Sequence, residues 1–173
     1  MLSVAKLARG REEYYLATLA GGREESGGLI EPDGRWLGSG AVTLGLSGTV
    51  DGPGLRTLLT GVDPVTGEVL AERHARVRVV AYDCTYSTPK SVSLLHALGP
   101  QDVRAQVRAG HEEAAEAALG YLERRAARVR RSPGGGEPAA SVPAGGFVAA
   151  CFLHRTSRAP DPHLHSGIGD STA

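Results

Sequence analysis

The chain has few of the residues that usually dominate a hydrophobic core. Aromatic residues make up 5% of its 173 residues, and there are only two cysteines and one methionine. Two isolated cysteines, Cys84 and Cys151, exclude a disulfide framework and a CxxC metal knuckle, so we expect two buried thiols. The core is therefore expected to consist mainly of Leu, Val and Ala. Hydrophobic residues still total 41%, which is typical of a globular chain, and the length predicts one domain, residues 1–173.

Excess charge of either sign is also absent, because 19 Lys and Arg balance 19 Asp and Glu. A nucleic-acid partner would therefore have to be held by a local basic face. No apolar run approaches the length of a membrane span, and the first residues lack a signal-peptide pattern. These absences favour a cytoplasmic protein without membrane insertion.

Hydrophobic periodicity predicts strands and helices in alternation, and hence an α/β or α+β fold. Strands are expected at residues 1–7, 75–87, 147–157 and 163–169, and helices at 9–19, 55–59, 88–98 and 101–131. Ser87 or Thr88 can cap the helix that includes Pro89. Trp36 and Leu37 are expected to attach a long loop to the body. The Gly- and Pro-rich residues 132–146 predict a mobile loop.

Three histidines near the end of the sequence are candidate metal ligands. His163 and His165 share a face of a predicted strand, and a hairpin through residues 155–162 could bring His154 alongside. Three neutral imidazoles would leave coordination positions for a substrate oxygen. The alternative is a set of solvated side chains. We expect the other histidines, His74, His96 and His111, on surfaces and without such a role.

Two adjacent tyrosines, Tyr14 and Tyr15, lie on a predicted amphipathic helix. A phenol has a pKa of about 10, so it is a poor nucleophile unless a base or a metal assists it. The alternative is that the pair forms the edge of a core, with the hydroxyls reaching water.

Asp83 shares a strand face with the apolar residues Val77, Val79 and Ala81. A carboxylate in that position is costly unless it is paired. Orienting a metal-bound histidine through its second ring nitrogen would supply the partner. A salt bridge to an arginine is the alternative.

Two basic features could contact phosphate groups. The start of the helix at residues 88–98 offers backbone N–H groups and Lys90, although an ordinary capped helix is the alternative. The end of the helix predicted at residues 101–131 carries Arg124, Arg125, Arg128, Arg130 and Arg131. Cations are favourable at a helix C-terminus in any case, so a DNA contact there is an option and not a requirement.

The blocks MLSVAKL, EEYYL, YDCTYSTPKSVSLL and HRTSRAPDPHLH follow one another in this order. The series resembles the N-terminal relaxase domain of the TrwC/TraI (MobF) conjugative relaxases, of the HUH endonuclease superfamily, over essentially the whole chain. The resemblance implies a palm-like fold with an antiparallel central sheet and helices packed on it, incomplete at the C-terminal end.

The resemblance also implies a reaction. In that family a tyrosine near the N-terminus attacks a DNA phosphodiester at the origin of transfer, which gives a 5′-phosphotyrosine and a free 3′-OH. The implied nucleophile is Tyr14, with Tyr15 as the alternative. Asp83 matches an aspartate that orients a histidine and helps to deprotonate the tyrosine, and His154 and His165 match two of three metal ligands.

The implied cofactor is a divalent ion, Mg²⁺ or Mn²⁺ with Zn²⁺ as an option. The implied partners are single-stranded DNA at an origin of transfer and other relaxosome proteins. Arg155 and Arg158 of the last block are candidate DNA contacts, together with Lys90, Arg124 and Arg128.

Two departures from the family pattern stand out. The third metal ligand should lie two residues after His165, where this chain has Gly167; His163 could substitute from the other side of His165. The second tyrosine pair of many members is absent from residues 21–34. Family domains also continue beyond this length, so a truncated domain is expected.

Three functions follow from these considerations: a strand transferase, a non-catalytic fragment that is inert or binds single-stranded DNA, and a replication-initiator-type nuclease. The order of tyrosine before histidine disfavours the last of these.

Overall fold

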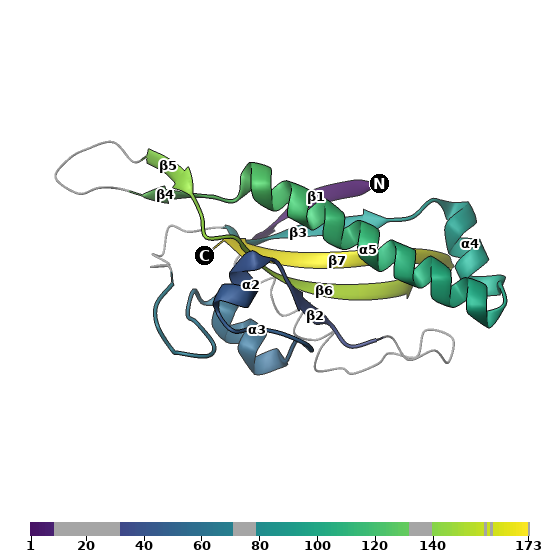
Figure 1. The fold of residues 1–173 in the computed structure, drawn as a ribbon, viewed down its shortest axis with the longest axis horizontal. Helices are drawn as coiled ribbons and strands as arrows, with labels where there is room; N and C mark the ends of the chain where they lie inside the picture. The colour runs from purple at the N-terminus through teal and green to yellow at the C-terminus, as the bar shows by residue number, and fades with distance from the viewer. Residues whose placement is uncertain (9–31, 71–78, 132–139, 158, 160, 173) are drawn as a thin grey trace.

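The fold is built on a five-stranded antiparallel sheet with the strand order β1-β3-β7-β6-β2 (Figure 1). This computed structural model describes residues 1–8, 32–70, 79–131, 140–157, 159 and 161–172. The strands of the sheet are β1 (Leu2–Ala8), β2 (Arg35–Leu37), β3 (Val79–Ser87), β6 (Phe147–Thr156) and β7 (Pro162–Thr172). A separate two-stranded sheet pairs β4 (Arg128–Arg131) with β5 (Ala140–Pro143). The mixed helix-and-sheet class implied by the sequence is confirmed.

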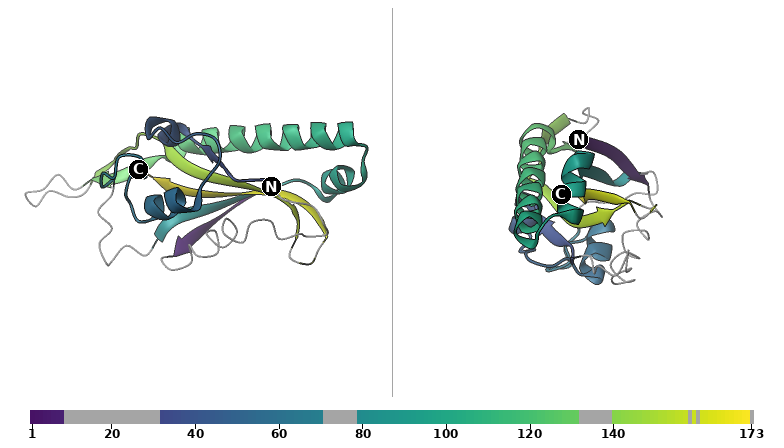
Figure 2. Two further views of the ribbon diagram at one scale, coloured as in Figure 1. Left: turned by 90° about the horizontal axis from the view of Figure 1, so that it is seen from below. Right: turned by 90° about the vertical axis from the view of Figure 1, so that its right-hand side faces the viewer.

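The described helices are α2 (Ser39–Thr43), α3 (Gly52–Leu59), α4 (Lys90–Leu98) and α5 (Gln101–Ala126). The long helix α5 lies along one face of the sheet, and α3 lies against the opposite face (Figure 2). Within the described residues, no helix is long and apolar enough to cross a membrane. The two faces of the sheet are therefore covered by different elements, and we refer to them as the α5 face and the α3 face.

Strand β6 is buried from Phe147 to Leu153, which explains its uninterrupted apolar sequence. Alternate residues of β6 join two core clusters, as the pleat of a strand requires. The cluster on the α3 face includes Val148, Ala150 and Phe152. The cluster on the α5 face includes Phe147, Ala149 and Cys151. Cys84 and Cys151 are both buried and form no disulfide, as expected.

The helix predicted to reach residue 131 ends earlier. Helix α5 stops at Ala126, and Ala127 adopts an extended backbone that leads into β4. Arg128 donates hydrogen bonds to the hydroxyl and the carbonyl oxygen of Ser141, which connects β4 to β5. Arg128 is therefore a strand residue and not part of a basic helix end. Residues 140–143 of the predicted loop form β5.

Two further expectations are corrected by burial. His96 and His111 were expected on surfaces, but they are only 8% and 4% exposed. Trp36 does attach its segment to the body, as expected, because it is buried in the core, but it does so from strand β2.

Candidate functional site

The hairpin of β6 and β7 brings two of the predicted ligands together. His154 lies directly opposite His165 in the strand register, and their ring centroids are 5.1 Å apart. Both side chains are half-buried. They point to the α3 face, because His154 is two residues after Phe152 and four after Ala150, and every second residue of a strand lies on the same face. The predicted hairpin is confirmed.

The third histidine, His163, joins the pair through His165. The rings of His163 and His165 are stacked, with centroids 4.7 Å apart. The Nδ1 atom of His165 lies 2.9 Å from the carbonyl oxygen of His163. Because a carbonyl oxygen only accepts, we assign the proton to Nδ1, which leaves the lone pair on Nε2. We call His154, His163 and His165 the histidine group.

The histidine group offers the ligand atoms of a metal site, but its three side chains are not arranged around one ion. Imidazole nitrogen is a ligand for Zn²⁺ and other divalent ions. Within the part of the chain that the structure describes, however, no three His, Cys, Asp or Glu side chains are arranged so as to hold one ion. His154 and His165 face one another, and His163 lies beyond them.

Asp83 points to the same face but does not reach the histidine group. It pairs with Gly169 on β7, whereas His165 pairs with Ser87, four residues further along β3. Four strand residues correspond to about 14 Å. The Oδ1 atom of Asp83 is buried and has no hydrogen-bond partner among the described residues. Neither a histidine nor an arginine there supplies the partner that the sequence led us to expect.

Gly167 lies on the same face of β7, between His165 and Gly169, the residue that pairs with Asp83. It pairs with Thr85 on β3 and with Phe152 on β6. A Cβ atom built on Gly167 meets no described atom within 4 Å, and the same holds for Gly169. Among the described residues, nothing therefore blocks a side chain at position 167, which would lie between Asp83 and the histidine pair.

The start of α4 contacts the strand that carries the histidines. Lys90 forms a salt bridge with Asp161 and donates a hydrogen bond of 3.0 Å to the carbonyl oxygen of Pro162. The N-cap is Pro89, and no side chain caps the helix. Thr88, predicted as a possible cap, bonds instead to the carbonyl oxygen of Leu164. No local sequence pattern predicts this contact.

Behind the histidine group, the α5 face carries a buried polar pair that the sequence did not reveal. His111 of α5 and Ser166 of β7 are joined by a hydrogen bond of 2.9 Å between Nε2 and Oγ. Burial, the largest influence, lowers the pKa of His111 to about 4. Burial likewise lowers the pKa of His96, assisted by the charge of Arg155. Both histidines are therefore neutral near pH 7.

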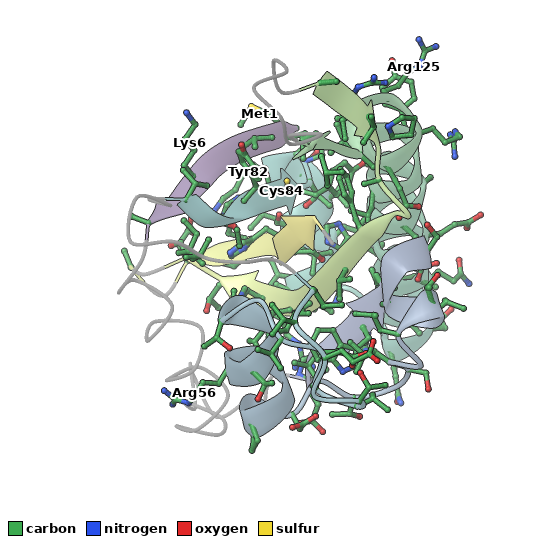
Figure 3. The ribbon with its side chains drawn as sticks, turned by 90° about the vertical axis from the view of Figure 1, so that its left-hand side faces the viewer. Met1, Lys6, Arg56, Tyr82, Cys84 and Arg125 are labelled. Carbon is green, nitrogen blue, oxygen red and sulfur yellow. The ribbon has the colours of Figure 1, made fainter. Side chains whose placement is uncertain are left out.

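The predicted DNA-contacting residues do not form one surface. Lys90 and Arg155 lie near the histidine group, whereas Arg124 lies in the last turn of α5 and Arg128 begins strand β4, which follows that far end of the helix (Figure 1). The 26 residues of α5 span about 39 Å. Figure 3 shows the basic side chains of Lys6, Arg56 and Arg125 on separate parts of the molecule. Tyr14, Tyr15 and Arg158 lie outside the described residues.

Comparison with known proteins identifies relatives of this chain. The family model described as TrwC relaxase matches residues 6–167. The multifunctional conjugation protein TraI of Escherichia coli is 34% identical over 135 residues, and that of strain K12 is 35% identical over 133 residues. These matches cover 78% and 76% of this chain but 7% of each relative.

Solved structures of a conjugative relaxase, TrwC, have the same fold. A metal-bound complex with oriT DNA superposes with a TM-score of 0.80 at 30% identity, and a metal-free complex with a TM-score of 0.77 at 29%. Each covers 98% of this chain, which in turn spans 56% and 55% of the solved chains.

Proposed function

The chain belongs to the TrwC relaxase family, and we propose on that basis that it transfers a DNA strand at an origin of transfer. The supporting observation is the pairing of His154 with His165 on the α3 face, in a chain whose solved relatives include complexes with oriT DNA. We further propose that it acts in the cytoplasm, together with other relaxosome proteins.

The proposed nucleophile is Tyr14, with Tyr15 as the alternative. The phenol oxygen forms a bond to the scissile phosphorus, the bond from phosphorus to the 3′ oxygen breaks, and the departing oxygen takes a proton. The 5′-phosphotyrosine keeps the phosphodiester energy for later rejoining. Because a phenol is mostly protonated at pH 7, a base must accept its proton. Asp83 is the proposed base, since its buried Oδ1 has no partner among the described residues.

The histidine group is the proposed site for a divalent ion. When bound, such an ion would withdraw charge from the scissile phosphate. His154 and His165 would be two ligands, and His163 the third, because its ring already lies against that of His165. Mg²⁺, Mn²⁺ and Zn²⁺ are the ions to compare, and imidazole donors favour Zn²⁺ among them.

The proposed DNA contacts divide into two sets. Lys90 and Arg155, near the histidine group, would hold the phosphates next to the scissile bond, together with Arg158. Arg124 and Arg128 would hold a more distant part of the strand. Backbone contacts of this kind give affinity that falls as salt concentration rises.

Covalent trapping tests the proposed function. The protein is incubated with single-stranded oligonucleotides carrying candidate origin sequences and with Mg²⁺, Mn²⁺ or Zn²⁺, and adducts are separated on a denaturing gel. We expect a DNA-linked band that Tyr14→Phe abolishes and Tyr15→Phe retains. Loss with Tyr15→Phe alone would move the nucleophile by one residue. An adduct that survives the double substitution would contradict a tyrosine mechanism.

A second function, binding of single-stranded DNA without cleavage, is favoured by Gly167, which lacks a side chain where the family has its third ligand. Filter binding in the same samples separates the two functions. Salt-sensitive binding without any adduct, in all three metals, would support this second function.

A further inference from the structure

Leu164 separates His163 from His165, and its backbone receives unusual partners. Its side chain is fully buried, and the β3–β7 ladder ends beside it, at the pair Ser87 and His165. Beyond that point β3 no longer offers a strand to pair with. The N–H and C=O groups of Leu164 are bonded by residues at the start of α4 instead.

Those partners are Thr88 and Ser93, which we call the hydroxyl pair. The N–H group of Leu164 donates to Oγ of Ser93 at 3.0 Å. The hydroxyl and the backbone N–H of Thr88 both donate to the carbonyl oxygen of Leu164, each at 3.1 Å. The two hydroxyl oxygens are 2.9 Å apart.

The two hydroxyl groups hold both polar groups of Leu164. Ser93 accepts the Leu164 N–H, and its own proton is shared between the hydroxyl of Thr88 at 2.9 Å and the carbonyl oxygen of Pro89 at 3.3 Å. Thr88 donates to the Leu164 carbonyl oxygen. Ser93 is only 1% exposed, so water cannot replace a missing hydroxyl there.

We propose that Thr88 and Ser93 are positioning residues that fix the peptide groups between His163 and His165, and thereby orient both rings. The proposal rests on the role given above to the histidine group. The peptides on either side of Leu164 carry the Cα atoms of both histidines, so a rotation there moves both rings. It would also move the His163 carbonyl oxygen away from Nδ1 of His165.

The test uses three substitutions and a matched control. Ser93→Ala removes the acceptor of the Leu164 N–H group, and Thr88→Val removes the hydroxyl that donates to the Leu164 carbonyl oxygen, whereas Thr88→Ser keeps both bonds. The control is Ser166→Ala. It removes a hydroxyl that is as buried as that of Ser93 and that lies on the α5 face of β7, the strand that carries Leu164. Thr88→Val is nearly isosteric and half-exposed, so it decides the question if Ser93→Ala does not fold.

Two readouts separate positioning from stability. Ring ¹⁵N NMR reports which nitrogen of His165 carries the proton, and titration with Zn²⁺ alone reports the affinity of the histidine group. We expect Ser93→Ala and Thr88→Val to shift His165 away from the Nδ1–H form and to lower the Zn²⁺ affinity at least about tenfold, as lost supporting hydrogen bonds do. Thr88→Ser and Ser166→Ala should stay close to the original protein in both.

The proposal is overturned if Ser93→Ala and Thr88→Val lower the melting temperature, as Ser166→Ala does, yet leave the His165 ring signals unchanged. The ring signals need neither DNA nor a DNA adduct. If the original protein forms no adduct, the proposed function fails, and the NMR comparison still decides the role of Thr88 and Ser93.

Discussion

The two faces of strand β7 differ sharply although their residues alternate along one segment. Leu164 and Ser166 point to the α5 face and are almost completely buried, at 0% and 1% exposure. His163, His165 and Gly167 point to the α3 face and are half-exposed. Among the described residues, helix α3 and its apolar cluster pack on the part of that face that includes Phe152, Ala150 and Val148. One face of β7 therefore supports the fold, and the other presents polar side chains available for chemistry.

The largest expected effect compares a substitution to alanine on each of the two faces. Leu164→Ala should lower the free energy of unfolding by about 2–5 kcal/mol, because it leaves a cavity where the side chain is fully buried. Gly167→Ala, on the other face, should be neutral or stabilise by up to about 1 kcal/mol, because the added Cβ meets no atom of the described residues within 4 Å. Urea denaturation measures both. Similar losses would mean that the faces do not differ.

The pH dependence of stability should come from the α5 face. The pKa of His111 is about 4 in the folded protein, below the ordinary value of 6.5, so the folded state favours the neutral ring. Between pH 6.5 and pH 4 the unfolded chain binds a proton that the folded protein does not, which should cost roughly 3 kcal/mol.

Denaturation curves at pH 7 and pH 4.5 measure that cost. His111→Gln keeps a polar group for Ser166 but does not titrate in this range, so it should flatten the dependence. His96, whose pKa is also lowered, should supply a remaining slope. An unchanged slope in His111→Gln would contradict this assignment.

Gly167→His should alter the α3 face without disturbing the other. The new imidazole would lie between His165 and Asp83, and one ligand more than His154, His163 and His165 supply should raise Zn²⁺ affinity at least about tenfold, or 1.4 kcal/mol. Gly169→His is the matched control. A Cβ atom at Gly169 also meets no described atom within 4 Å, but it lies two residues further along β7 from the histidine pair. Calorimetric titration compares the two, and equal gains would show that position 167 is not special.

The smallest effect is expected at the edge of the site. The Lys90–Asp161 salt bridge joins side chains that are 51% and 58% exposed. Such exposed pairs contribute at most about 1 kcal/mol, and salt weakens them. Lys90→Met should therefore change the melting temperature little while reducing the affinity for single-stranded DNA. A large stability loss with unchanged DNA affinity would reverse the role proposed for Lys90.

The sequence predicted the parts of the fold that depend on local periodicity and chain order. Strands β3, β6 and β7 and the pairing of His154 with His165 follow from alternation and from a short, proline-containing hairpin. The end of α5 could not be predicted in this way, because no local pattern around Arg128 distinguishes a longer helix from a short strand. Its hydrogen bonds to Ser141, which is 13 residues away, decide the outcome.

Long-range polar contacts were the least predictable. Thr88 has the expected type and place for a helix cap, yet it bonds to Leu164, 76 residues further along the chain. His111 lies in a helix rich in charged residues, and its burial depends on Ser166, which is 55 residues away. Neither contact has a periodic signal, since both depend on how α4 and α5 lie against β7.

The central claim, that the chemistry belongs to the α3 face, is tested most directly by two adjacent residues of β7. The single-turnover rate of covalent DNA adduct formation is measured for His165→Gln and Ser166→Ala under identical conditions. We predict a loss of at least about 100-fold for His165→Gln, because removing an assisting group costs that much or more. Ser166→Ala should remain within a few fold of the original protein. Equal rates for the two variants, or no adduct from the original protein, would contradict the claim.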